Sequence, residues 1–185
     1  MTGRKNAMIA MFAACLAMLP MPLQAQLPAG AQAPLFATRG AIAGKPFAYN
    51  LRSARRRGPV VIYFFPKAFT QGCTLETRAF AEAIDRFRAA GASVIGMSTD
   101  DLPTLQRFST EECRGRFPVA MATPDIISAY DVAMQREGAA TGLASRTSYV
   151  IARDGTVRFV HANLDYRDHV RLTLEAVEAL RPARR

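Results

Sequence analysis

The chain has 185 residues, half of them hydrophobic, and a formal net charge of +9 at neutral pH. This length allows one ordinary packed domain rather than two full-sized ones, and the hydrophobic content excludes an intrinsically disordered chain. Basic and aromatic residues do not interleave along a stripe suited to stacking bases, so we expect no nucleic-acid partner.

The first 25 residues have the pattern of a secretory signal peptide. Arg4 and Lys5 form a positive start, residues 7–19 form an apolar core, and Ala25 is a small residue at a cleavage point. The apolar core is short for a membrane span of about 20 residues. We therefore expect cleavage near Ala25, export to the periplasm and no stable membrane insertion afterwards. Cys15 lies inside the apolar core, which favours an unmodified residue over a lipoprotein anchor.

Residues 26–185 then remain as a single domain. Its first part, from residue 26 to about residue 40, is rich in Ala, Pro and Gly and predicts a loose lead-in. Residues 47–51 indicate an early strand or hairpin arm. The arginine run at 55–57 ends at Gly58 and is typical of a solvated turn. Residues 60–65 form a continuous apolar run, which predicts a central strand covered on both faces.

An amphipathic helix is expected at about residues 75–88, ended by Gly91. Its apolar stripe consists of Leu75, Ala79, Phe80, Ala83, Ile84 and Phe87. The later elements, in chain order, are a strand at 93–98, a helix from Pro103, a strand at 117–121, a helix at 124–134, strands at 147–152 and 156–160 around Asp154-Gly155, and a helix at 167–180. This alternation predicts an α/β fold with a central mixed sheet flanked by helices.

The segment Pro66–Thr74 joins the strand at 60–65 to the helix and contains Cys73. At the start of a helix, free backbone N–H groups and the helix dipole favour a thiolate, which is a nucleophile. Cys73 is therefore a candidate nucleophile, although a lone cysteine can also be a small buried hydrophobe. Thr70 could simply cap the helix, and Pro66 could simply end the strand.

The spacing of Pro66, Thr70 and Cys73 resembles the active-site pattern of the peroxiredoxins, and the residues around it are most similar to the bacterioferritin comigratory protein, or Q-type, branch. Arg146, just before a predicted strand, matches the active-site arginine of that family. The resemblance implies a thioredoxin-like fold with an N-terminal β extension. It also implies a monomeric peroxidase for hydrogen peroxide and organic hydroperoxides that uses a thioredoxin-like reductant. It implies no metal, haem or flavin cofactor.

The same resemblance implies a role for each motif residue. Cys73 would attack one peroxide oxygen and become a sulfenic acid. Arg146 would hydrogen-bond the thiolate and the peroxide and stabilise the charge that develops as the O–O bond breaks. Thr70 would direct its hydroxyl toward the sulfur, and Pro66 would shield the sulfur without offering a competing N–H group. Apart from the resemblance, Asp100 and Ser98 lie at the end of a predicted strand near the site and could help to fix the local network.

A second thiol is expected to resolve the sulfenic acid as a disulfide. Many Q-type relatives carry that thiol five residues after the nucleophile, where this chain has Arg78. Other relatives carry it on the next helix, and we expect Cys113 to take this role. The alternative is a single-cysteine peroxidase in which Cys113 is structural. His161 and His169 have no motif partner, so we expect them to be structural or solvent-facing.

Two other functions remain open at this level. A thiol–disulfide oxidoreductase of exported proteins would have the same fold, but such proteins normally carry a Cys-x-x-Cys pair, and no second cysteine follows Cys73 at that spacing. A non-enzymatic binding module would react with peroxide as slowly as a free thiol does.

Overall fold

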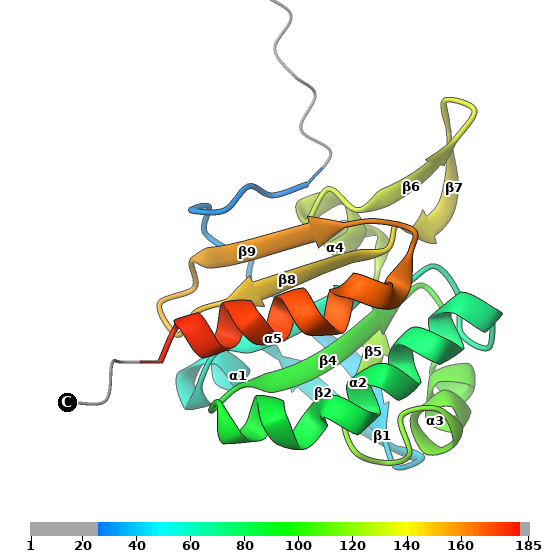
Figure 1. Ribbon diagram of the computed structural model, residues 1–185. Coiled ribbons are helices and arrows are strands. Elements are labelled where there is room, and N and C mark those ends of the chain that lie inside the picture. Colours follow the sequence, from blue (N-terminus) through cyan, green and yellow to red (C-terminus); the bar gives the residue numbers. More distant parts are fainter. Residues whose placement is uncertain (1–25, 182–185) are drawn as a thin grey trace, which may run out of the picture.

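The computed structural model describes residues 26–181 (Figure 1). The predicted signal peptide at 1–25, including its cleavage point and Cys15, lies outside the described residues. No helix within residues 26–181 is long and apolar enough to cross a bilayer.

A seven-stranded mixed sheet forms the centre of the molecule, in the order β2-β1-β5-β4-β3-β8-β9 (Figure 1). Its strands are β1 (Ala37–Ile42), β2 (Lys45–Asn50), β3 (Val60–Phe64), β4 (Ser93–Ser98), β5 (Val119–Met121), β8 (Thr147–Ile151) and β9 (Val157–Ala162). Strands β3, β4 and β5 run parallel, and the other neighbours pair antiparallel. The predicted turn at Asp154-Gly155 joins β8 to β9 as expected. The carboxyl ends of β3, β4 and β5 therefore meet at one edge of the sheet.

Helices cover both faces of the sheet. They are α1 (Leu51–Arg57), α2 (Gln71–Ala89), α3 (Leu102–Glu111), α4 (Pro124–Ala129) and α5 (His169–Ala179), the last preceded by a short 3-10 turn at Tyr166–Asp168. All five residues of β3 are buried, and successive residues of a strand point to opposite faces. On one face the core includes Ile62 and residues of α1 and α4. On the other face it includes Tyr63 and residues of α2, α3 and α5. These observations confirm the predicted α/β architecture.

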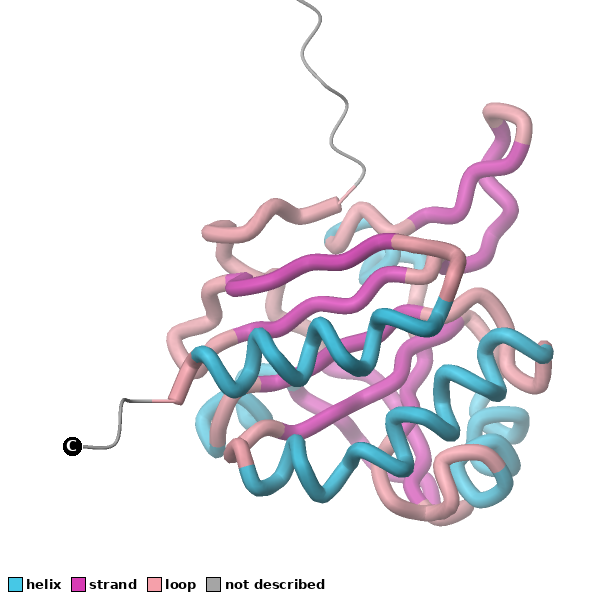
Figure 2. The backbone as a smooth tube through the Cα atoms, in the orientation of Figure 1, coloured by secondary structure: helices cyan, strands magenta, loops and turns pink. Residues whose placement is uncertain are grey.

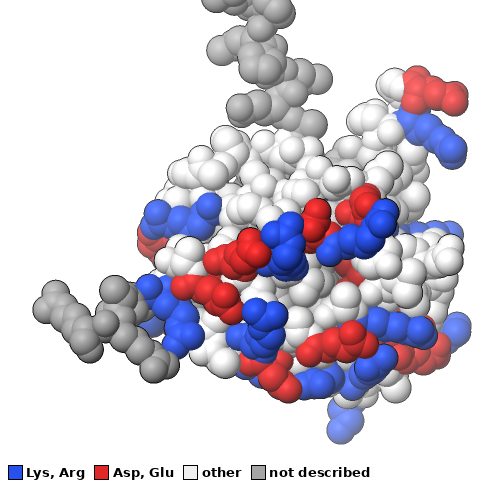
Figure 3. Space-filling model, in the orientation of Figure 1, with Lys and Arg blue, Asp and Glu red and all other residues white. Residues whose placement is uncertain are grey.

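The outer surface of α2 and α5 carries acidic and basic side chains that alternate rather than separate (Figure 3). Arg171, for example, pairs with Asp168 and Glu175 along α5, and Arg86 of α2 pairs with Glu178. Most of these pairs are exposed, so each contributes little to stability.

The arginine run was predicted as a solvated turn, and this prediction was wrong. Residues 55–57 form the last turn of α1. Asn50 caps this helix by accepting a hydrogen bond from the Ser53 N–H at 3.0 Å. Leu51 and Ala54, three residues apart, bury one side of the helix against the sheet. The lead-in is also shorter than expected, because β1 already begins at Ala37.

Helix α2 begins at Gln71, four residues earlier than expected, and this changes which residues face the core. Leu75 was placed on the apolar stripe but is 39 % exposed. The buried side of α2 instead carries Cys73, Glu76, Thr77, Phe80, Ala81, Ile84 and Phe87. Cys73 is therefore the third residue of the helix.

The predicted helix at 124–134 is also too long. Helix α4 ends at Ala129, and a second, two-stranded sheet follows, made of β6 (Ala133–Arg136) and β7 (Ala139–Ala144). Figure 2 shows this hairpin extending away from the rest of the molecule. Glu137 and Gly138 both have positive φ, which is the geometry of a tight two-residue hairpin turn.

Candidate active site

Cys73 lies in the first turn of α2, almost completely buried, with 1 % of its surface exposed. The helix begins shortly after the loop that follows β3, so Cys73 lies at the positive end of the helix dipole. The sulfur lies against the apolar cluster on this face of the sheet, which includes Phe65 and Phe80. Nη2 of Arg146 donates a hydrogen bond to the Cys73 sulfur at 3.4 Å.

Arg146 precedes β8 and reaches the site from the neighbouring strand. It is 6 % exposed, and three of its nitrogens have separate partners. Nε donates to the Leu164 carbonyl oxygen at 2.9 Å, Nη1 donates to a carboxylate oxygen of Glu76, and Nη2 donates to the Cys73 sulfur. Gly72 leaves room for this arrangement, because a Cβ atom there would lie 3.2 Å from Nη2. The guanidinium group is thus fixed on three sides.

Glu76 is a member of the site that the sequence reasoning missed. It is fully buried one turn after Cys73, and it pairs with Arg146. Burial raises the pKa of Glu76 to about 8, although Arg146 acts in the opposite direction. A signal for Glu76 was present in the sequence, since it lies three residues after Cys73 and four before Phe80, on the side of the helix that faces the core.

Thr70 occupies the N-cap position of α2 but makes no side-chain cap hydrogen bond, so the simple capping alternative is wrong. Its hydroxyl donates to the Lys67 carbonyl oxygen at 2.9 Å instead of approaching the Cys73 sulfur. Pro66 is partly buried and follows β3 after one further residue.

The loop between Pro66 and α2 is held by the end of the next strand. The Ala68 N–H donates to Asp100 Oδ2 at 2.7 Å, and the Ser98 hydroxyl donates to the same oxygen at 2.9 Å. This confirms the prediction that Asp100 fixes the local network.

Cys113 lies just beyond α3, fully buried, and both described cysteines are free thiols. Burial raises the pKa of Cys113, and the neighbouring Glu112 raises it further. Glu112 itself pairs with Arg78 of α2 at 2.5 Å. Both thiols belong to the same apolar cluster, so the two cysteines share one core although they lie on different elements. Among residues 26–181, no three His, Cys, Asp or Glu side chains gather closely enough to hold a metal ion.

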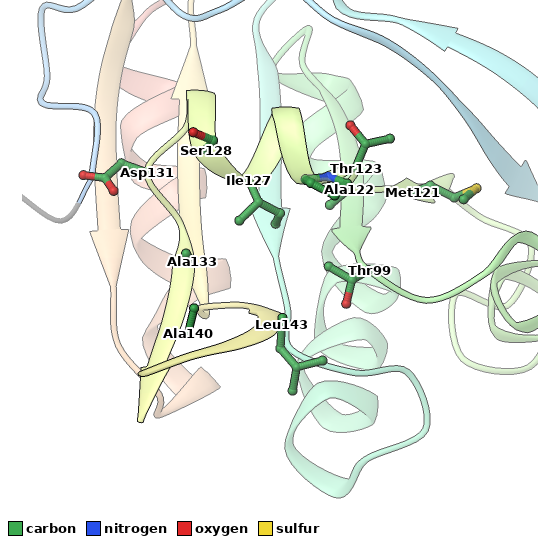
Figure 4. A pocket seen from close by; sticks show the side chains of 12 residues that line it. Thr99, Met121, Ala122, Thr123, Ile127, Ser128, Asp131, Ala133, Ala140 and Leu143 are labelled. Carbon is green, nitrogen blue, oxygen red and sulfur yellow. The ribbon is translucent and has the colours of Figure 1, made fainter. Parts of the chain in front are cut away.

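A pocket of about 550 Å³ opens at the same edge of the sheet as the cysteine loop (Figure 4). Thr99 after β4, Ile127 of α4 and Leu143 of β7 contribute to its wall. Figure 4 shows these side chains around a mostly apolar space. Neither Cys73 nor Arg146 lines this pocket, and its residues Ala122 and Ile127 belong to the core layer on the face of the sheet opposite Cys73.

Residues 29–160 match the AhpC/TSA family. The chloroplastic peroxiredoxin Q of Suaeda salsa is 32 % identical over 136 residues, which cover 71 % of this chain and 61 % of that protein. The chain thus spans about three fifths of the length of this curated relative.

Solved structures show the same fold. The peroxidoxin BcpB of Mycobacterium tuberculosis superposes with a TM-score of 0.74 at 26 % identity, covering 83 % of this chain and 98 % of that one. The bacterioferritin comigratory protein of Xanthomonas campestris, studied for its alkyl peroxide reduction activity, gives a TM-score of 0.67 at 25 % identity. That alignment covers 76 % of this chain and 90 % of the Xanthomonas chain.

Proposed function

The chain belongs to the AhpC/TSA family, and we propose that it is a thiol-dependent peroxidase of the peroxiredoxin Q type with Cys73 as its nucleophile. The observation that carries the proposal is the hydrogen bond from Arg146 to a buried sulfur at the start of a helix. This arrangement supplies positive charge and N–H donors to an anionic sulfur in a site that excludes water.

In the first step the Cys73 thiolate attacks one oxygen of the hydroperoxide. An S–O bond forms, the O–O bond breaks, and the departing oxygen leaves as water or an alcohol after taking up a proton. The sulfur is oxidised to a sulfenic acid while the peroxide is reduced. The guanidinium of Arg146 stabilises the negative charge as it moves from sulfur to oxygen. Pro66 and Thr70 shape the loop through which the peroxide enters.

In the second step we assign the resolving thiol to Cys113. Its sulfur attacks the sulfenic sulfur, a disulfide forms and water leaves. A thioredoxin-like dithiol then reduces the disulfide and is itself oxidised. Both thiols are buried, Cys73 in the first turn of α2 and Cys113 just beyond the end of α3, so local opening of these segments must precede the disulfide. The single-cysteine alternative, with Cys113 as a structural thiol, predicts a lasting sulfenic acid instead.

Hydrogen peroxide and organic hydroperoxides are the proposed substrates. The alkyl peroxide reduction studied in the Xanthomonas relative supports the second class. The thiol–disulfide oxidoreductase alternative has less support, since the position three residues after Cys73 holds Glu76, which is committed to Arg146.

The rate constant for reaction with hydrogen peroxide tests the proposal directly. Stopped-flow measurements should show the wild-type thiol reacting at least a thousandfold faster than free cysteine. Cys73→Ser should abolish peroxide consumption, and Cys113→Ser, the matched control, should retain the first oxidation. Peroxide consumption that survives in Cys73→Ser would reject the assignment.

We also propose that residues 26–185 act as one exported, monomeric domain, cleaved near Ala25 and active in the periplasm. The plant relatives are chloroplastic, so they provide a parallel for a removable leader rather than for this compartment. The intact mass of the protein recovered from a periplasmic extract tests the cleavage point, and sedimentation tests the monomer. Full-length protein confined to the cytoplasm would contradict the proposal.

A further inference from the structure

Behind Arg146 the site is closed by polar side chains that the proposed chemistry does not use. His169, the first residue of α5, is fully buried among them. Its Nδ1 lies 2.8 Å from the Ser148 hydroxyl, and its Nε2 lies 2.9 Å from the Asn163 carbonyl oxygen. The sequence predicted that His169 is either structural or solvent-facing, and its burial excludes the solvent-facing alternative.

The partners of His169 determine where its proton lies. A carbonyl oxygen can only accept, so Nε2 must carry a hydrogen and donate it to Asn163. In a neutral imidazole Nδ1 is then an acceptor, and the Ser148 hydroxyl donates to it. Burial lowers the pKa of His169 to about 4, which keeps the ring neutral at physiological pH. Its orientation is therefore set by one donated and one accepted hydrogen bond.

Charged and titratable groups surround this ring from several elements. Oε1 of Glu76, on α2, lies 3.6 Å from Nδ1 and has no hydrogen-bond partner among residues 26–181. The His161 ring of β9 packs edge-on with its centroid 4.6 Å away. Arg146 and Asp165 are the remaining charges that affect the ring, and they act in opposite directions.

Residues 163–164, which His169 contacts through the Asn163 carbonyl oxygen, also contact Arg146. The Asn163 N–H donates to the Arg146 carbonyl oxygen at 3.3 Å, and the Leu164 carbonyl oxygen accepts the Arg146 Nε–H at 2.9 Å. Ser148 lies in β8, two residues after Arg146, which directly precedes that strand. His169 thus ties the strand that presents Arg146 to the loop that receives its guanidinium group.

We propose that His169 is a positioning residue for Arg146, fixing residues 163–164 so that Nη2 of the guanidinium group remains directed at the Cys73 sulfur. This inference rests on the proposed peroxidase function. Glu76 holds Nη1 from the side of α2, and the Leu164 carbonyl oxygen holds Nε from the opposite side. Without the imidazole the loop loses its inward hydrogen bond, and Nε loses a fixed acceptor. Nη2 of Arg146 is then no longer held in the orientation that directs its hydrogen bond to the Cys73 sulfur.

The test measures the rate constant with hydrogen peroxide in His169→Leu and His169→Gln. The leucine removes both hydrogen bonds, whereas the glutamine amide retains a donor for Asn163. We expect about a tenfold loss for leucine and less than about a threefold loss for glutamine. His161→Gln is the matched control, since the His161 side chain makes no hydrogen bond to Asn163 or Leu164 in the structure of residues 26–181, and this variant should stay within about twofold of wild type.

A double-mutant cycle separates positioning from general stability. In an Arg146→Lys background, where the forked group is absent, His169→Leu should change the rate by less than about twofold, because the group that it positions is missing. Loss of stability measured by urea should be similar in both backgrounds. An equal loss of rate in both backgrounds, or an equal loss in the leucine and glutamine variants, would overturn the proposal.

Ser148→Ala provides a second test should the leucine variant fail to fold. It removes the donor to Nδ1 while retaining the ring, and we expect about a threefold loss of rate together with faster solvent exchange of the Arg146 Nε–H proton. Unchanged exchange and rate would overturn the proposal. If the wild-type protein itself reacts no faster than free cysteine, the proposed function fails. If the wild-type protein and the His169 and Ser148 variants all react rapidly with hydrogen peroxide, the proposed function stands and only the positioning role of His169 is rejected.

Discussion

Replacing the buried carboxyl of Glu76 should change how stability depends on pH. Burial raises the pKa of Glu76 to about 8 in the folded protein, against a reference value of 4.5. The folded state therefore binds a proton that the unfolded state releases across this interval. Its stabilising effect is complete below pH 4.5 and is lost progressively as the pH rises through about 8.

The size of the effect follows from this shift. Each pH unit within the interval costs the folded protein about 1.4 kcal/mol, so the loss is about 3 kcal/mol at pH 7 and about 5 kcal/mol above pH 8. Glu76→Gln has a similar shape but cannot ionise. The unfolding free energy of wild type minus that of the variant should therefore fall steadily between pH 5 and 8.

Urea denaturation at half-unit pH steps measures both free energies, and subtraction removes the titration of groups that the two proteins share. Glu82→Gln, at an exposed position of the same helix, reports the effect of deleting a carboxylate away from Arg146. A difference curve for Glu76→Gln that is flat or rises with pH would refute the reasoning. It would show that attraction to Arg146 outweighs burial and keeps the carboxylate ionised.

Three further predictions concern the core and the second thiol. Phe80→Ala should lower the unfolding free energy by about 3–5 kcal/mol in urea, because the buried ring stacks on Tyr63 at 4.3 Å; a loss below about 1 kcal/mol would contradict this. Arg78→Ala removes a partly exposed ion pair with Glu112 that is worth about 1 kcal/mol or less. The Cys73–Cys113 disulfide should therefore form up to about fivefold faster after addition of peroxide, as measured by gel shift. An unchanged rate would show that the ion pair does not hold the Cys113 segment closed. Cys113→Ser should retain the first peroxide reaction but lose steady-state turnover with thioredoxin, and full turnover would refute a resolving role.

The main sheet was predictable because its signals are local. The run at 60–65 is apolar throughout, and β3 is buried along its whole length. Asp154-Gly155 marks the turn between β8 and β9. Helix α1 escaped prediction because seven residues bury only Leu51 and Ala54, too few to show a period, while its three arginines suggest a turn. The β6–β7 hairpin is mostly exposed and so carries no apolar alternation.

The site residues likewise include some that the sequence indicated and others that it did not. Cys73 was recognisable from its place between a strand and a helix, and Arg146 from the family resemblance. Glu76 and His169 were missed because a charged or polar residue ordinarily marks the outside of a helix. Their burial depends on Arg146 and Ser148, which lie 70 and 21 positions away in the chain. The helical spacing of Glu76 indicates that it faces the core, but its pairing with Arg146 exists only after the chain has folded, so periodicity cannot reveal the partner.

The sheet separates two apolar layers, and both thiols belong to the layer beneath α2, α3 and α5. The opposite layer, beneath α1 and α4, has its own set of buried side chains. Under the proposed mechanism, opening of the segments around Cys73 and Cys113 would disturb the layer that holds the thiols and would not require the opposite layer to open. A linker or solid support attached through α1 would therefore contact the layer that does not hold the thiols.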